Sequence, residues 1–192
     1  GGVLLTAAQA LAQAPGVTMV SARDQAFVVN DGENSAADIT ITATAADTIF
    51  PTSGIQVRIP DSLDLTWVQP VQGSVTFTGT AVTAQNIDAT QVPTISPDAK
   101  VVIIAVADTF AINEQGGISG LQFRVGGSIS APTSLQVSVD NGANFLVNDT
   151  TQIGIGQPSI LSASAQIFVA SDGTVSSANI TISDHPTAGA IV

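Results

Sequence analysis

The chain has 192 residues, with 15 acidic residues against four basic ones and a formal net charge of −11. Nucleic acid and anionic membrane surfaces are excluded as partners, because both are bound through clusters of lysine and arginine. With 44% apolar and 10% charged residues, the composition is typical of a folded chain, and no run of 18 apolar residues predicts membrane insertion.

The residue types favour strands over helices. Valine, isoleucine and threonine are abundant, and β-branched side chains fit a pleated sheet better than a helix. The chain has no cysteine, which removes disulfides and thiolate chemistry. Low lysine content, acidity and many Thr, Ser and Asn residues are typical of an exported protein. We therefore expect an all-β protein that is secreted or lies at the cell surface.

Residues 1–16 form a separate N-terminal segment. The stretch Gly2–Ala14 ends in Ala12-Gln13-Ala14, as the tail of a secretory signal does, but it has no basic start and no long apolar core. A short helix or a packed strand is the alternative. We interpret the segment as the tail of a preceding repeat, or as an arm that packs on a neighbour.

Alternating apolar residues and turn signals predict the strands of the first half. The turn Asn30-Asp31-Gly32 separates two of them. Trp67 alternates with Leu63 and Leu65, which favours a place in the core over an exposed surface that stacks on sugar. The predicted strands are Thr18–Ser21, Gln25–Val29, Ala37–Ala43, Gly54–Ile59, Leu63–Val68 and Gly73–Thr80.

The second half begins with the continuous apolar run Lys100–Ala107, which predicts a central strand buried on both faces. Further strands are predicted at Gly117–Val125, Leu135–Val139 and Gln152–Gly156. Strands that recur about every ten residues between Gly, Pro and Asn/Asp turns predict an antiparallel jelly-roll-type β-sandwich.

An internal repeat is the most informative feature of the sequence. Residues 17–41 align without a gap over residues 158–182, and 12 of the 25 positions are identical. After a deletion of six residues the match resumes, with residues 51–57 over 186–192. The identical pairs include Ser21/Ser162, Gln25/Gln166, Phe27/Phe168, Asp31/Asp172, Gly32/Gly173, Ile39/Ile180 and Ile41/Ile182.

The repeat predicts how the chain is organised. Residues 17–157 form one repeat, and residues 158–192 form the opening of a second. The second copy predicts only two strands and a turn, which cannot form an independent domain. Either the chain is a window on a longer array, or residues 158–192 donate strands to a neighbouring molecule.

Several weak motifs follow one another in an order that resembles the cohesin family, an extracellular jelly-roll sandwich related to some carbohydrate-binding modules. The similarity covers about residues 17–157. It implies a jelly-roll fold and, as an alternative function, a recognition module that binds dockerin or a glycan. The motifs are Phe27-Val28-Val29, Asp31-Gly32, Ile39-Thr40-Ile41, Pro51–Ile55, Ile59–Leu63, Gly117–Val125 and Ala131-Pro132.

No catalytic constellation stands out. The single histidine, His185, has no plausible nucleophile beside it, and the aligned position near Thr44 is not histidine. The carboxylates, such as Asp108 and Glu114, are scattered, and we expect them to be solvated loop residues. The sequence therefore predicts no catalytic residues, no certain cofactor and no enzymatic activity.

Calcium is the one candidate ligand. Turns rich in Asp and Asn supply the oxygen ligands that Ca²⁺ prefers, and Asp31, Asp140 and Asp149 lie in such turns. Asn-Asp-Gly is also a turn former without any metal, so both interpretations stay open. Asn148 and Asn179 each begin an acceptor motif for N-glycosylation.

We expect a structural function. Tandem repeats build surface layers and filaments, and copies of the chain that share strands would assemble head to tail as a homopolymer or array. The expected partners are therefore neighbouring copies of the chain, with dockerin or a glycan as the alternative.

Overall fold

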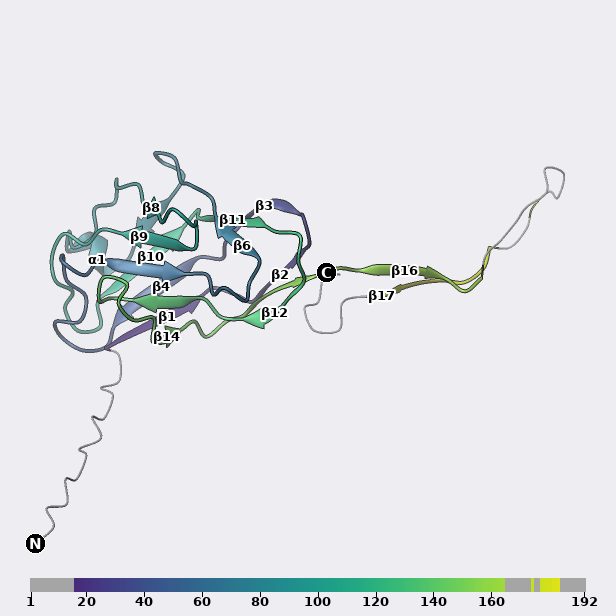
Figure 1. The fold of residues 1–192 in the computed structure, drawn as a ribbon. Coiled ribbons are helices and arrows are strands. Elements are labelled where there is room, and N and C mark those ends of the chain that lie inside the picture. The colour runs from purple at the N-terminus through teal and green to yellow at the C-terminus, as the bar shows by residue number, and fades with distance from the viewer. Residues whose placement is uncertain (1–15, 165–173, 175–176, 184–192) are drawn as a thin grey trace, which may run out of the picture.

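The computed structural model describes residues 16–164, 174 and 177–183, and it shows an all-β chain with several antiparallel sheets (Figure 1). None of the helices in these residues has the length and apolarity to cross a membrane. We call residues 16–157 the body. A two-stranded ribbon follows the body in the sequence.

The four-stranded sheet of the body has the order β1-β4-β10-β7. Its apolar residues alternate along the strands, so that one face is buried and the other is open. The strands are β1 (Val17–Ser21), β4 (Ile39–Ala43), β10 (Gln115–Ser119) and β7 (Thr76–Thr78).

The five-stranded sheet has the order β14-β13-β5-β9-β8, and every pair in it is antiparallel. Its strands are β14 (Val147–Asn148), β13 (Gln136–Ser138), β5 (Ile55–Arg58), β9 (Val101–Ile104) and β8 (Thr94–Ile95).

Two three-stranded sheets complete the body, with the orders β3-β11-β6 and β12-β15-β2. The pair β15–β2 is parallel, so the last strand of the body lies beside one of its first. The strands are β3 (Gly32–Ser35), β11 (Gln122–Val125), β6 (Leu65–Trp67), β12 (Ser130–Thr133), β15 (Ile153–Gly156) and β2 (Gln25–Val28). A single short helix, α1 (Thr80–Thr83), lies between β7 and β8 in the described sequence.

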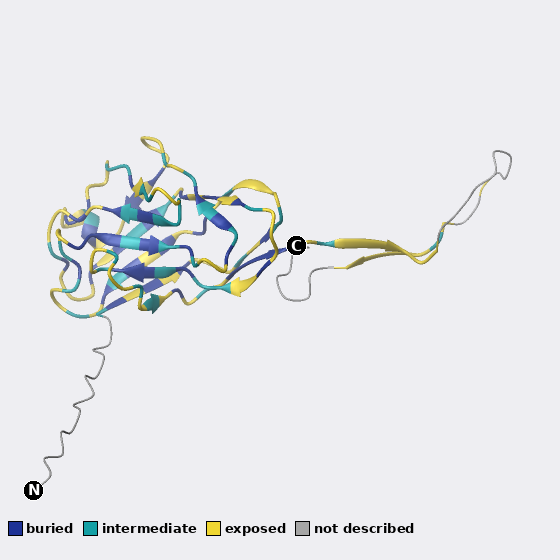
Figure 2. Cartoon of the chain, in the orientation of Figure 1, coloured by how far each residue is buried: buried dark blue, intermediate teal, exposed yellow. Residues whose placement is uncertain are grey.

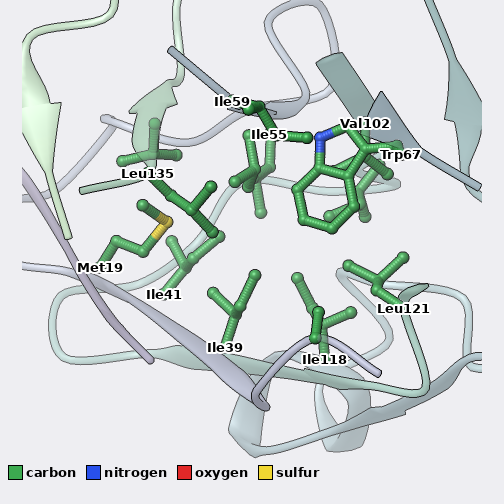
Figure 3. Close-up of a cluster of buried hydrophobic side chains, with 14 of the residues drawn as sticks. Met19, Ile39, Ile41, Ile55, Ile59, Trp67, Val102, Ile118, Leu121 and Leu135 are labelled. Atoms are coloured by element: carbon green, nitrogen blue, oxygen red, sulfur yellow. The ribbon is translucent and has the colours of Figure 1, made fainter. Parts of the chain in front are cut away.

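One apolar core joins these sheets (Figure 3). Met19, Ile39 and Ile41 point into it from the four-stranded sheet, toward Ile55 and Val102 of the five-stranded sheet. The Trp67 ring, buried as predicted, stacks on Phe123, with ring centroids 4.6 Å apart. Burial of each such large side chain stabilises the fold by about 1.5–3 kcal/mol.

Most of the predicted strands are confirmed, with boundaries shifted by one to three residues at the ends. The run Lys100–Ala107 is the clearest correction. Only β9, Val101–Ile104, is a strand, and its residues are alternately buried and half-exposed. β9 lies between β5 and β8, but Val101 and Ile103 are half-exposed on one face, so the prediction of burial on both faces was wrong.

The predicted strand Gly117–Val125 is two strands in different sheets. Gly120 separates β10 from β11 and has φ +83°, a value that a strand cannot contain. The strands β3, β8, β12 and β14 were not predicted. The N-terminal segment up to residue 15 and His185 lie outside the described residues, so the interpretations of both remain predictions.

The two ends of the body lie far apart (Figure 1). β1 starts at the end of the body where α1 also lies, and the chain leaves β15 at the other end, where the ribbon begins. Only Gln157 and Pro158 separate β15 from the first strand of the ribbon. The connection is therefore too short to act as a long flexible linker.

Candidate functional site

The ribbon consists of β16 (Ser159–Ser162) and β17 (Ile180–Ser183), which pair in antiparallel register. Ile160 lies opposite Ile182, and Ser162 lies opposite Ile180. The amide of Ala163 donates to the carbonyl of Asn179 at 2.9 Å and extends the pairing by one position. Opposite residues of such a pair lie on the same face, so three isoleucines form one apolar face.

All four residue pairs of the ribbon repeat the register of β1 and β4. Met19 lies opposite Ile41 and Ser21 opposite Ile39, and adding 141 to each number gives the pairs of the ribbon. The flanking hydrogen bond is repeated too, because Ala22 N donates to Asp38 O at 2.8 Å. The sequence repeat therefore extends to the local backbone structure.

The surroundings of the two pairs differ completely (Figure 2). In the body, Met19 is 1% exposed and Ile41 is 0% exposed, whereas in the ribbon Ile160 is 71% and Ile182 is 65% exposed. The ribbon points away from the body, and all of its strand residues are exposed. Exposed, contiguous apolar faces of this kind are typical of interaction surfaces.

The backbone of the ribbon is also incompletely paired. In the body, β4 lies between β1 and β10, and Ile41 lies opposite Gly116 of β10. In the described part of the chain, β17 pairs with β16 alone. Its outer edge therefore offers amide and carbonyl groups to a further strand.

A buried carboxylate holds β1 in place at the edge of its sheet. Asp149 is 5% exposed, and it accepts hydrogen bonds from the amide of Ser21 at 2.9 Å and from the hydroxyl of Ser21. It also accepts from the hydroxyl of Thr151 at 3.0 Å and from its amide at 3.3 Å. We call this arrangement the Asp149 clasp. Its hydrogen bonds explain the burial of Asp149 without a bound metal.

The other two calcium candidates lie in separate turns. Asp140 accepts from the hydroxyl of Ser138 at 2.5 Å and from Asn144, and the Ser138 hydrogen bond lowers the pKa of the Asp140 carboxyl. Asp31 accepts from the side chain of Asn34 at 3.2 Å. Nowhere in the described residues do three or more His, Cys, Asp or Glu side chains gather around one point. The structure does not bring Asp31, Asp140 and Asp149 together.

Two hollows in the body surface contain acidic side chains. One, of about 440 Å³, lies beside α1 and includes Ile112 and Glu114. Glu114 is buried, contrary to the expected solvated carboxylate, and its oxygens accept from Asn86 at 2.9 and 3.0 Å. The other, of about 520 Å³, is lined by Asp24 and Asp31 together with Arg23, whose positive charge offsets one of the two carboxylates.

Comparison of the chain with protein-family models, curated proteins and solved structures found no match. The candidate site therefore rests on the geometry of the chain itself. Sequence reasoning found the repeat that forms the ribbon, but it missed the Asp149 clasp. The only signal for the clasp was the identity of Ser21 and Ser162 within the repeat.

Proposed function

We propose that the chain is a non-enzymatic structural module of a repetitive extracellular surface or filament protein, in which neighbouring modules share strands. The observation that carries this proposal is the ribbon. It has the register of β1 and β4, but its apolar side chains are exposed, and among the described residues its outer edge has no partner strand. When a ribbon packs into a neighbouring module, its apolar side chains become buried and its outer edge gains a partner strand.

The geometry of the body supports assembly in a line. The ribbon leaves the body at the end opposite the start of β1, so contacts made through it are head to tail (Figure 1). A contact between two different surfaces of identical molecules does not close on itself unless the rotation forms a ring, and it produces open filaments. We also propose that the body is a cohesin-like, jelly-roll-type β-sandwich, which is supported by the single core that the two largest sheets share.

The test compares the full chain with a chain that ends at Gln157. Light scattering measures the molar mass as a function of concentration, and negative-stain microscopy detects filaments. We expect the full chain to self-associate and the shortened chain to stay monomeric, because only the first carries the ribbon. Monomers of both chains at every concentration would contradict the proposal and would favour recognition of dockerin or a glycan.

A further inference from the structure

The place that β1 and β4 occupy in the body defines what the ribbon is suited to bind. We call this place the seat. It consists of the edge of β10, which pairs with β4, the core that receives Met19, Ile39 and Ile41, and the Asp149 carboxylate. Every group that the seat binds is on the core face or at the edges of the β1–β4 pair.

The ribbon carries the groups that the seat binds. Ile160, Ile180 and Ile182 replace three buried apolar residues with side chains of similar size, two of them identical. Ser162 is the counterpart of Ser21, whose hydroxyl donates to Asp149 in the body, and it has the same hydroxyl group. A match that includes both the apolar face and the single buried polar partner is more specific than apolar exposure alone.

Proline at position 158, in place of Val17, does not disturb the fit. Ala22 donates to Asp38, and Gly16 accepts from Thr44, so the even-numbered residues of β1 bond to β4. The amide of Val17 therefore points away from β4, and a proline there removes no hydrogen bond between the two strands.

Each copy of the chain has one seat and two segments that fit it. The copy's own β1–β4 pair has the advantage, because its binding is intramolecular and corresponds to an effective concentration of roughly millimolar. The resident β1–β4 pair is favoured for a second reason, which concerns residue 43 and its counterpart in the repeat, residue 184. Ala43 is 0% exposed, and the residue that continues β17 is Asp184, whose charge is costly to bury. The ribbon therefore enters a seat only when the resident pair has left it.

We propose that the ribbon of one copy exchanges with the β1–β4 pair of a second copy and occupies its seat, with β17 beside β10 and Ser162 on Asp149. The inference rests on the proposed function, strand sharing, and names the acceptor surface. The partner is a second copy of this chain. Crowding of modules in a filament or surface layer favours the exchange, because it raises the local concentration of ribbons.

Cysteine cross-linking tests the seat directly, because the chain has no cysteine of its own. Thr42 lies opposite Gln115 across β4 and β10, and Ser183 is the ribbon's counterpart of Thr42. A chain with Ser183→Cys and Gln115→Cys is unfolded in urea, refolded at high concentration and oxidised. We expect a ladder of disulfide-linked oligomers, and about tenfold more of it when Asp184→Ala is added to remove the buried charge.

Two matched chains control for chance contacts. Thr42→Cys with Gln115→Cys should form an intramolecular disulfide, which shows that the geometry permits the bond. Leu161→Cys with Gln115→Cys should give no ladder, because Leu161 lies on β16 and does not border β10 in the seat.

The outcomes separate this inference from the proposed function. If the full chain self-associates but the Ser183–Gln115 cysteine pair links no better than the Leu161–Gln115 pair, strand sharing stands and the seat is overturned. If the chain stays monomeric and Asp184→Ala produces no ladder, both proposals fail. A ladder specific to the Ser183–Gln115 pair and increased by Asp184→Ala supports the exchange.

Discussion

At the scale of single residues, the Asp149 clasp is the feature that most distinguishes the edge of the body. A buried carboxylate is tolerated only when hydrogen bonds replace its hydration. Ser21 and Thr151 supply four of them through two amides and two hydroxyls. Because Ser21 is 128 residues away in sequence, the clasp ties the first strand of the body to the segment just before its last strand.

Replacing the Asp149 carboxylate should therefore destabilise the fold. We expect Asp149→Ala to lower the free energy of unfolding by about 3 kcal/mol, because it removes hydrogen bonds to a charged group and leaves buried donors without acceptors. Urea unfolding followed by the fluorescence of Trp67, the only tryptophan, measures the change.

The exposed Asp61 provides the control, since Asp61→Ala removes a carboxylate from a surface turn and should change stability by no more than about 0.5 kcal/mol. Equal losses for the two variants would mean that the clasp adds nothing beyond an ordinary surface carboxylate.

The sequence predicted which apolar residues are buried better than which polar ones are. Alternation with Leu63 and Leu65 placed Trp67 in the core, and all three side chains are buried. Asp149 and Glu114 were expected to be exposed or metal-bound, and both are buried. Each also bonds to a residue distant in sequence, Asp149 to Ser21 and Glu114 to Asn86, and no local pattern encodes a contact of that kind.

At the scale of elements, Gly120 controls how the second half of the body divides between sheets. It ends β10 in the four-stranded sheet and lets β11 begin in another. A Cβ atom at this position would lie 2.1 Å from the carbonyl oxygen of Ser74. Both the left-handed backbone and the contact with Ser74 therefore exclude a side chain.

We expect Gly120→Ala to lower the free energy of unfolding by about 3 kcal/mol or more, because backbone strain and a steric clash combine. Gly73→Ala is the matched control, since Gly73 has φ +81° but its added Cβ would meet nothing within 4 Å. That variant should lose only about 1 kcal/mol. Similar losses in urea unfolding would show that the clash contributes nothing.

The strands that sequence reasoning missed are short or polar. β8 and β14 have two residues each, and β3, Gly-Glu-Asn-Ser, has no apolar residue. They exist because a neighbouring strand offers them an edge to pair with, which is a tertiary effect. The prediction for β9 failed for a related reason, because a continuous apolar run does not reveal whether both faces of the sheet are covered.

At the scale of the whole molecule, the repeat was the strongest prediction, and the structure adds its physical consequence. A sequence comparison shows that residues 158–182 resemble residues 17–41. It does not show that the second copy forms the same ribbon in the same register without the surroundings that bury the first. The ribbon register is therefore encoded within the ribbon segment, whereas burial of its apolar face requires the rest of a module.

This separation can be tested by supplying the missing part in the same chain. We expect a chain of residues 1–183 followed by a second copy of residues 43–157 to form two complete modules, because the ribbon then precedes a seat and alanine replaces Asp184 at the buried position. Hydrogen exchange of the ribbon amides measures the outcome, and we expect strong protection, since these amides become part of a core sheet.

The same extended chain with Ile160→Asp and Ile182→Asp is the control, because two charges on the apolar face oppose its burial. It should keep the first module folded and leave the ribbon amides in rapid exchange. Rapid exchange of the ribbon amides in the extended chain without these substitutions would contradict the equivalence of the ribbon and the β1–β4 pair. Protection in that chain alone would show that the ribbon completes the core of residues 43–157 as β1 and β4 do in the body, which is the property that a linear array of strand-sharing modules requires.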